Sequence, residues 1–422
     1  YALSLNNLAS TYSDLGNYDK ALEMNLKCLY LREKIFGKEH PDYALSLNNL
    51  AQTYSSLGDY NRALEMHLEC LSLREKIFGR EHTNYASSLN NLASTYSDLG
   101  NYHKALELDK VCLDLREKIF GREHPNYAAS LNNLASTYSD LGDYNKALEL
   151  SLECLSLREK IFGKEHPDYA LSLNNLAQTY SSLGDYDKAL EMNLKCLSFW
   201  EKIFGKEHPD YASSLNNLAS TYSYLGNYNK ALELNLACLD LREKILGKEH
   251  PDYAISLNNL ALAYLDLGDY DKVLELNLEC LELGEKSLGK EHPDYALSLN
   301  NLALTYSSLG DYDKALEMNL KCLSLREKIF GKEHPDYALS LNNLAQTYSN
   351  LGDYDTALKM QLECFALYEK ILGKEHPNYA SSLGNIAQTY SSLGDYDKAL
   401  ELNLACLSLR EKILGKEHPD YA

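Results

Sequence analysis

Three residue types recur in this 422-residue sequence at positions where they can do chemistry: cysteine, histidine and asparagine. One histidine recurs every 42 residues, always after Glu, from His40 to His418, and only His67 and His103 fall outside this series. The cysteines follow the same period: Cys28, Cys70, Cys112, Cys154, Cys196, Cys238, Cys280, Cys322, Cys364 and Cys406. Thiols and imidazoles ligate metals and serve as nucleophile and general base, so those are the first two chemistries to consider.

Neither chemistry is supported by the spacing. No two cysteines stand at zinc-ligand spacing, and one histidine per 42 residues supplies neither convergent ligands nor an oriented catalytic partner. Packed helices lie about 8–10 Å apart, whereas a disulfide needs Cα atoms within about 7 Å. We therefore expect ten buried, reduced thiols, and a histidine that shapes a turn.

Other signatures of catalysis are missing from the sequence. It has no Gly-rich phosphate loop, no Ser-His-Asp order and no paired carboxylates that stand out from the repeat. We expect a chain that is not an enzyme, with no catalytic residue, no cofactor and no metal site.

The period of 42 residues covers the whole chain and identifies stacked supersecondary units. Ten near-identical repeats form one predicted array over residues 1–422: 1–42, 43–84, 85–126, 127–168, 169–210, 211–252, 253–294, 295–336, 337–378 and 379–420. The chain begins in register at Tyr1 and ends at Ala422, two residues into an eleventh repeat. It is expected to be a fragment of a longer protein.

Each repeat has the pattern of two amphipathic helices. In the second repeat, helix A has apolar residues at three- and four-residue steps: Leu47, Leu50, Ala51, Tyr54 and Leu57. Asp42 is the predicted N-cap and Gly58 the stop. After a turn at Asp59, helix B is predicted over Tyr60–Phe78 and ends at Gly79. Such a helical hairpin cannot bury its apolar face alone, but stacked copies can.

The run N-L-A-x-x-Y-x-x-L-G-x-Y-x-x-A-L, from Asn49 to Leu64, resembles the tetratricopeptide repeat signature. The usual period of that family is about 34 residues, and here the extra residues lengthen helix B. L-N-N-L-A followed by L-R-E-K-I-F-G-K-E-H-P is similar to the kinesin light chain and nephrocystin-3 branch. The resemblance implies an all-α, right-handed α-solenoid that binds proteins, with cysteine where related repeats usually carry alanine.

The resemblance also implies that helix A lines a concave groove in which an extended peptide lies. The second asparagine of L-N-N-L matches the family position that commonly holds the ligand backbone, because an amide offers both donor and acceptor: Asn7, Asn49, Asn91, Asn133, Asn175, Asn217, Asn259, Asn301, Asn343 and Asn385. A second role is open for these amides, which is to tie neighbouring helices together.

Variation among the repeats concentrates on one stripe of helix A, which matches the ligand-facing positions of the family. From it we predict further peptide-binding residues: Gln52, Gln178, Tyr224, Gln346 and Gln388. No helix A carries Lys or Arg, so a neutral or weakly basic ligand is expected. The acidic cargo peptides bound by kinesin light chains fit this surface poorly.

Two irregularities lie on helix B. Phe199 and Trp200 replace Leu-Arg in the fifth repeat, either as an exposed anchor for a partner or as local packing. Gly284 and Ser287 replace Arg and Ile in the seventh repeat. Both residues weaken a helix, so we predict a local bend or early unfolding there.

The overall charge bears on partners and location. The 61 acidic and 41 basic residues give a net charge of −20, which disfavours nucleic acid and anionic membranes. No apolar run approaches the roughly 20 residues needed to span a bilayer, so a cytoplasmic location is expected. Four other functions are alternatives to the peptide-binding scaffold. They are an architectural spacer, an array that associates end to end, the sensor region of a larger signalling protein, and a kinesin light chain-like cargo adaptor.

Overall fold

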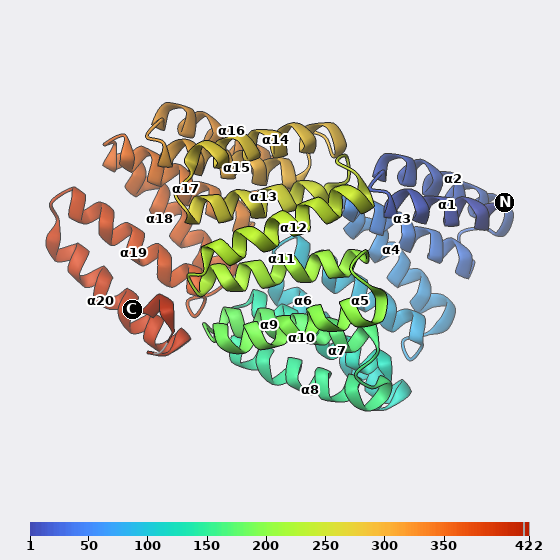
Figure 1. The fold of residues 1–422 in the computed structure, drawn as a ribbon. Coiled ribbons are helices and arrows are strands. Elements are labelled where there is room, and N and C mark those ends of the chain that lie inside the picture. The colour runs from blue at the N-terminus through green and yellow to red at the C-terminus, as the bar shows by residue number, and fades with distance from the viewer. Residues whose placement is uncertain (417, 422) are drawn as a thin grey trace. The chain divides into compact units, whose positions relative to one another are not determined.

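The structure is a computed structural model that describes residues 1–416 and 418–421, with the backbone alone at Asp420 (Figure 1). Ala422, the last residue of the predicted array, lies outside the described residues. Within them the protein is all-α, as predicted: it has twenty α-helices and one short 3-10 turn, η1 (Pro419–Tyr421). The helices alternate between two types that we call A and B.

The A helices are the odd-numbered ones, and each opens one repeat. They are α1 (Ala2–Asp14), α3 (Pro41–Ser56), α5 (Thr83–Asp98), α7 (Pro125–Asp140), α9 (Pro167–Ser182), α11 (Pro209–Tyr224), α13 (Pro251–Asp266), α15 (Pro293–Ser308), α17 (Pro335–Asn350) and α19 (Pro377–Ser392). Most A helices start at a proline, whose fixed φ and missing N–H suit the first helical position.

The B helices are the even-numbered ones and are longer, which confirms that the extra residues of the repeat extend helix B. They are α2 (Tyr18–Phe36), α4 (Tyr60–Phe78), α6 (Tyr102–Phe120), α8 (Tyr144–Phe162), α10 (Tyr186–Phe204), α12 (Tyr228–Leu246), α14 (Tyr270–Ser287), α16 (Tyr312–Phe330), α18 (Tyr354–Ile371) and α20 (Tyr396–Leu414). Most of them span 19 residues, about five turns.

The turn from A to B forms as the sequence predicts. Gly58 has a φ of 73°, in the left-handed region that favours glycine. Its N–H donates to the Ser55 carbonyl at 2.9 Å, and the N–H of Asp59 donates to the Tyr54 carbonyl at 2.9 Å. The Asp59 carboxylate then accepts the N–H of Arg62 at 3.1 Å and caps α4. One short segment therefore ends one helix and starts the next.

The predicted start of helix A was wrong by two residues. Asp42 is not the N-cap, because α3 already begins at Pro41. The cap is His40, whose Nδ1 accepts the backbone N–H of Asp42 at 3.1 Å while its ring stacks on Phe36 at a centroid distance of 4.5 Å. The recurring histidine thus shapes the linker, as expected, and does so as a helix cap.

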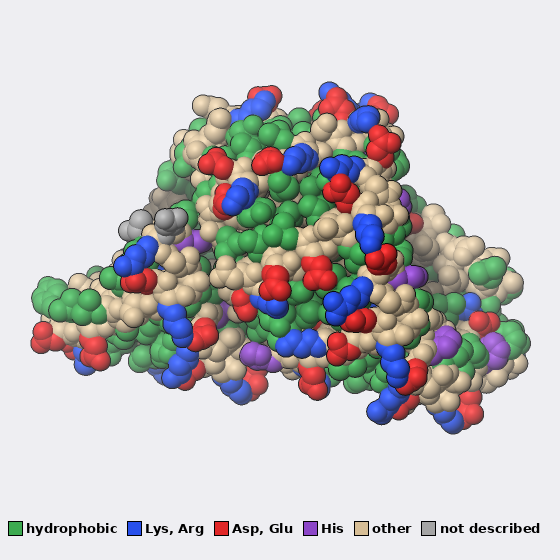
Figure 2. All heavy atoms as spheres, turned by 90° about the horizontal axis from the view of Figure 1, so that it is seen from below, with side chains coloured by type: hydrophobic (Ala, Val, Ile, Leu, Met, Phe, Trp, Pro, Cys, Tyr) green, Lys and Arg blue, Asp and Glu red, His purple; other side chains and the backbone are tan. Residues whose placement is uncertain are grey.

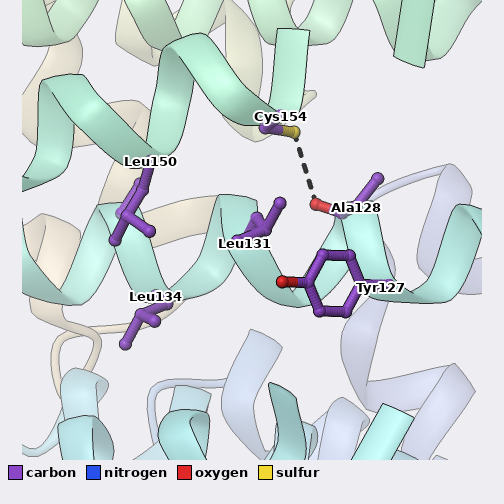
Figure 3. Close-up of a cluster of buried hydrophobic side chains, with 7 residues drawn as sticks. Tyr127, Ala128, Leu131, Leu134, Leu150 and Cys154 are labelled. Carbon is purple, nitrogen blue, oxygen red and sulfur yellow. Dashed lines mark hydrogen bonds between the residues drawn. The ribbon is translucent and has the colours of Figure 1, made fainter. Parts of the chain in front are cut away.

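The core is a series of small clusters between the helices. In the fourth repeat Leu131 and Leu134 of α7 face Leu150 of α8, and the Cys154 thiol donates to the Ala128 carbonyl at 3.3 Å (Figure 3). Ala128 is fully buried, so the helices approach closely at that point. All ten cysteines are buried and remain reduced thiols, as predicted.

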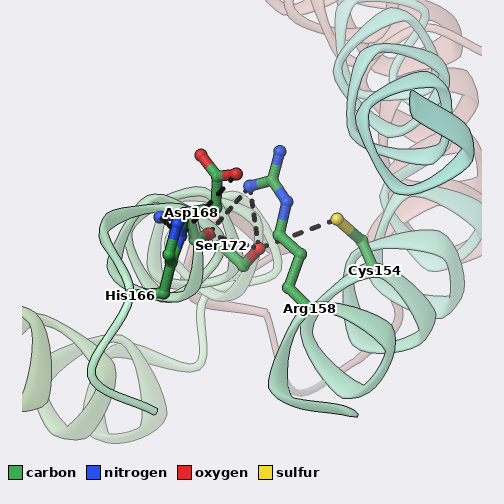
Figure 4. Close-up of polar contacts among 5 residues, drawn as sticks. All are labelled: Cys154, Arg158, His166, Asp168 and Ser172. Carbon is green, nitrogen blue, oxygen red and sulfur yellow. Dashed lines mark hydrogen bonds and ion pairs between the residues drawn. The ribbon is translucent and has the colours of Figure 1, made fainter. Parts of the chain in front are cut away.

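A buried arginine joins most repeats to the next one. Arg158 of α8 donates from Nη1 to the Asp168 carbonyl at 2.9 Å and to the Ser172 hydroxyl at 3.0 Å, both on α9 (Figure 4). The Cys154 sulfur lies 3.7 Å from the same hydroxyl, and burial raises the pKa of this thiol. The cysteine is therefore a packing residue held in its neutral form rather than a reactive thiolate.

Where another residue takes the place of this arginine, the contact between successive repeats changes. Trp200 is only 7 % exposed and stacks on His208 at 5.0 Å, so its interpretation as an exposed anchor was wrong and local packing is what it does. Gly284 lies buried in α14, which spans 18 residues and ends at Ser287. Tyr368 takes the same place in α18, which is also 18 residues long.

Contacts divide the chain into two compact units. The first comprises Tyr1–Asp140, Lys146–Ser172 and Glu249–Pro251, and the second comprises Leu141–Asn145, Leu173–Lys248 and Asp252–Ala422. Within the units A helices pack on the following B helices, as α3 does on α4 and α17 on α18, and B helices pack on the next A helices, as α4 does on α5 and α18 on α19. Each unit is thus a stack of helical hairpins, which is the α-solenoid arrangement that the repeat predicts.

The charged side chains are interspersed on the surface. Figure 2 shows acidic and basic groups alternating over the face in view, without a large patch of one sign. Several pairs link successive repeats, such as Lys76 with Glu39, and both side chains of that pair are well exposed, so it adds little stability. Among the described residues, no helix has the length and apolar character to cross a membrane.

Candidate ligand-binding groove

The asparagines predicted to bind a peptide form a ladder along the A helices. The second asparagine of one repeat donates from Nδ2 to Oδ1 of the first asparagine in the repeat before it. Asn91 reaches Asn48 at 2.8 Å, and Asn133 reaches Asn90 at 2.8 Å, both in the first unit. Asn343 with Asn300 and Asn385 with Asn342 repeat this distance in the second unit. These amides therefore tie neighbouring helices together, which is the second of their two expected roles.

The remaining asparagines fit the same scheme with some variation. Asn49, Asn217, Asn259 and Asn301 donate in the same way to Asn6, Asn174, Asn216 and Asn258. Asn7 belongs to the first repeat and lies exposed, and Asn175 is half-buried on α9. Because a carboxamide has two donors and two acceptor lone pairs, one ladder bond leaves each amide with capacity for a further hydrogen bond.

The predicted stripe beside the ladder is exposed. Gln52, Gln178, Gln346 and Gln388 all point out of the A helices, and Tyr224 is 60 % exposed. Tyr224 stacks on Tyr186 at a centroid distance of 5.0 Å. These five residues thus lie on A helices, as the ladder does: Gln52 belongs to the first unit, and Gln178, Tyr224, Gln346 and Gln388 belong to the second.

In the first unit the stripe borders two cavities. The larger, of 330 Å³, is lined by residues of α3 to α7, among them Gln52, Asn91 and Asn133. The smaller, of 310 Å³, is lined by residues of α1 to α3, among them Asn49 and again Gln52. Four predicted binding residues therefore line two adjoining cavities, and Gln52 is common to both.

The larger cavity has an acidic lining that the sequence analysis missed. Asp98, Asp109 and Asp140 come from three successive helices, α5, α6 and α7. Burial raises the pKa of each carboxyl to about 6, and the charges of Asp98 and Asp109 further raise that of Asp140. The effect of both charges on Asp140, together with the shared cavity lining, means that the three carboxyls lie close enough to act on one ligand.

His67 of α4 also lines this cavity. Its side chain is 2 % exposed, and its Nδ1 atom is buried without a hydrogen-bond partner among the described residues. Burial, and secondarily the charge of Arg74, lowers the pKa of His67 to about 4, so the ring is neutral near pH 7. In the first repeat Asn25 takes the same place and donates to the Thr53 hydroxyl at 2.9 Å.

The signal that reveals His67 and Asp109 is a break in the repeat. Six repeats carry asparagine at this position of helix B: Asn25, Asn193, Asn235, Asn277, Asn319 and Asn403. The second and third repeats carry His67 and Asp109 instead. The sequence shows that His67 lies outside the regular histidine series, but assigns no role to it or to Asp109. Among the residues that the structure describes, no group of His, Cys, Asp and Glu side chains is arranged to hold a metal ion.

Comparison with protein families gives one result that covers the chain. The tetratricopeptide repeat model matches overlapping segments: residues 1–76, 56–118, 84–160, 126–202, 183–244, 210–286, 267–328, 309–370 and 336–412. This confirms the family resemblance of the sequence. The family supports a role as a protein-interaction scaffold, and its members are typically non-catalytic. None of the curated proteins compared with the chain matches it.

Solved structures give further similarities. The kinesin light chain-like protein of Podosopora anserina with nearly identical TPR-like repeats is 27 % identical, with a TM-score of 0.41 over 47 % of this chain and 94 % of that one. BtubC of P. vanneervenii is 21 % identical, with a TM-score of 0.43 over 55 % and 91 %. A Rap protein complexed with Competence and Sporulation Factor is 15 % identical and has a TM-score of 0.55 over 98 % of both chains, a likeness of fold alone.

Proposed function

This chain belongs to the tetratricopeptide repeat family, and from that premise we propose that it is a non-catalytic scaffold that binds an extended peptide or protein segment along its A helices. The observation that carries the proposal is the pair of adjoining cavities in the first unit, which meet at Gln52. Two cavities in series suit a ligand that is longer than it is wide. An extended peptide has that form.

The amide ladder supplies the chemistry for such a ligand. An extended peptide presents N–H and C=O groups at regular intervals that it cannot satisfy internally. Asn91 and Asn133 line the larger cavity and each retain hydrogen-bonding capacity beyond their ladder bond. The Rap protein that shares this fold is complexed with Competence and Sporulation Factor, so a solenoid of this kind can hold a second molecule.

A peptide array probed with the whole chain tests the proposal. Peptides that bind the chain should bind Gln52→Ala roughly tenfold more weakly, because Gln52 borders both cavities and its side chain is exposed, so the change leaves the fold intact. Asn61→Ala, an exposed amide on the B helix of the same repeat, is the matched control. If peptides bind the unaltered chain, Gln52→Ala and Asn61→Ala equally well, the binding surface lies elsewhere.

End-to-end self-association of the array is the alternative. Leu400 and Leu404 of α20 are exposed, as an apolar contact between copies requires. Analytical ultracentrifugation separates the two: a sedimentation coefficient that rises with protein concentration, together with an empty peptide array, favours association.

A further inference from the structure

The lining of the 330 Å³ cavity of the first unit is acidic. Asp98, Asp109 and Asp140 line the cavity, and none of its lining residues is Lys or Arg. Asp14 and Asp266 also carry aspartate at the A-helix position of Asp98 and Asp140, whereas six repeats carry an uncharged residue there: Ser56, Ser182, Tyr224, Ser308, Asn350 and Ser392. Carboxylates are thus gathered at one place on a scaffold that does not require them there.

A buried, unpaired nitrogen gives an independent sign of a ligand. The Nδ1 atom of His67 lies in the lining of this cavity, in a side chain that is 2 % exposed, and it has no hydrogen-bond partner among the described residues. Leaving such an atom unpaired destabilises the folded chain. Asn25 fills the equivalent place in the first repeat and bonds to Thr53. The exchange of asparagine for His67 therefore leaves a polar atom that a ligand can satisfy.

Asp109, in the next repeat, is a second buried polar side chain in this lining. Its side chain is 4 % exposed, and its Oδ2 accepts a hydrogen bond from the Thr137 hydroxyl at 2.7 Å. Arg116, whose charge acts on Asp109, donates instead to the Asn126 carbonyl and the Ser130 hydroxyl. A buried carboxylate without a paired cation destabilises the folded chain. Four residues, His67, Asp98, Asp109 and Asp140, depart from the neutral pattern around a single cavity.

We propose that this cavity binds a cationic group, the guanidinium or ammonium of a ligand, through the carboxylates of Asp98, Asp109 and Asp140 and the Nδ1 atom of neutral His67. A planar guanidinium carries five N–H donors, and an ammonium carries three. Carboxylates and a neutral imidazole nitrogen are acceptors for them. The proposal rests on the proposed function, since it takes the cation to be a side chain of the bound peptide.

Two peptides and one small molecule test the proposal on the whole chain. The first peptide is acetyl-Gly-Ser-Gly-Ser-Arg-Ser-Gly-Ser-Gly-amide, and the second carries citrulline in place of arginine, which keeps the shape and removes the charge. The small molecule is agmatine, a free guanidinium compound. Binding is followed by NMR titration of the chain, which detects weak association.

Three variants accompany these probes. The double variant Asp98→Asn with Asp140→Asn and the single variant Asp109→Asn use the amide that other repeats carry at these positions, Asn350 and Asn25. Asp114→Asn, an exposed carboxylate on the same helix as Asp109, is the matched control. Circular dichroism checks that each variant is folded.

We expect the arginine peptide to bind the chain at least tenfold more tightly than the citrulline peptide, and to bind Asp109→Asn and the double variant about tenfold more weakly. Asp114→Asn should bind like the unaltered chain. Equal binding of both peptides overturns the cation pocket and leaves the peptide-binding function standing. Agmatine binding that the double variant loses, without binding of either peptide, supports the pocket and counts against the peptide function. If no probe binds at millimolar concentration, the proposal fails.

Discussion

The backbone N–H of Asn84 donates to Nδ1 of His82 at 3.1 Å, so a histidine caps the N-terminus of α5. The ring of His82 also stacks on Phe78, with 4.4 Å between the centroids. The same arrangement recurs at other linkers, for example between His376 and Asn378 at 3.0 Å. Since α5 starts with Thr83 where most other A helices start with proline, the histidine maintains the boundary without help from a proline.

Replacing His82 by alanine should lower the free energy of unfolding of the chain by about 1 kcal/mol, because the cap bond is lost. His82→Asn keeps an acceptor at the cap and should recover most of the loss. Urea denaturation followed by circular dichroism measures both changes. His103→Ala removes an exposed histidine of α6 that is not a cap and serves as control. An equal loss from His82→Ala and His103→Ala would contradict the capping role.

Gly284 weakens the seventh repeat in a way that can be repaired. An added Cβ at Gly284 meets no other atom within 4 Å, so a side chain fits. Gly284→Ala should gain about 1 kcal/mol from helix propensity. Gly284→Arg should gain more, because an arginine there can donate to the Asp294 carbonyl and the Ser298 hydroxyl, as Arg326 does to Asp336 and Ser340.

Hydrogen exchange locates this effect. Amides in the last two turns of α14 should exchange faster than those of α12, and Gly284→Arg should remove the difference. Faster exchange in the variant, or no difference between the two helices in the unaltered chain, would show that Gly284 is not a weak point.

Trp200 offers an internal probe of the fifth repeat. As it is 7 % exposed and packs against Phe199, Phe204 and His208, its fluorescence emission should lie at short wavelength in the native chain and shift to longer wavelength on unfolding. Trp200 is the single tryptophan of the sequence, so the signal reports on that repeat alone. Efficient quenching of the native emission by iodide would contradict its burial.

The helices of this protein could be predicted from the sequence because each is set by local rules repeated ten times. Gly58 ends α3 through its positive φ, and the period of apolar residues such as Leu47 and Leu50 defines the buried face. The start of helix A was misplaced, because aspartate is a preferred N-cap and histidine is not. Proline favours the first helical position, so Pro41 in the sequence indicates that the preceding residue, His40, is the cap.

The site could be predicted only in part. The ladder asparagines were found from their matching family position, but their bonds to one another depend on the distance between A helices, which the sequence does not state. His67 and Asp109 lie on helix B, whose polar residues look solvent-exposed in the sequence. Only the packed structure shows that both are buried beside the A helices.

The burial of His67 predicts a pH dependence of stability. Its pKa falls from an ordinary value of about 6.5 in the unfolded chain to about 4 in the folded one, through burial and the charge of Arg74. Above pH 6.5 the His67 ring is neutral in both the folded and the unfolded chain. Between pH 6.5 and 4 the ring takes up a proton readily only in the unfolded chain. The chain therefore loses stability as the pH falls from 6.5 towards 4. His67→Asn, which installs the residue of the first repeat, should remove this part of the loss, about 2 kcal/mol at pH 5.

The matching carboxylate should show the opposite sign. Burial raises the pKa of Asp109 to about 6, against the lowering influences of Thr137 and Arg116. The folded chain holds this proton more tightly than the unfolded chain, so stability is lost as the pH rises through 6, and Asp109→Asn should be more stable than the unaltered chain at pH 7.5 but not at pH 4. Urea denaturation of both variants from pH 4 to 7.5 measures these differences. Curves for His67→Asn and Asp109→Asn that run parallel to that of the unaltered chain would show that neither group titrates in a buried site.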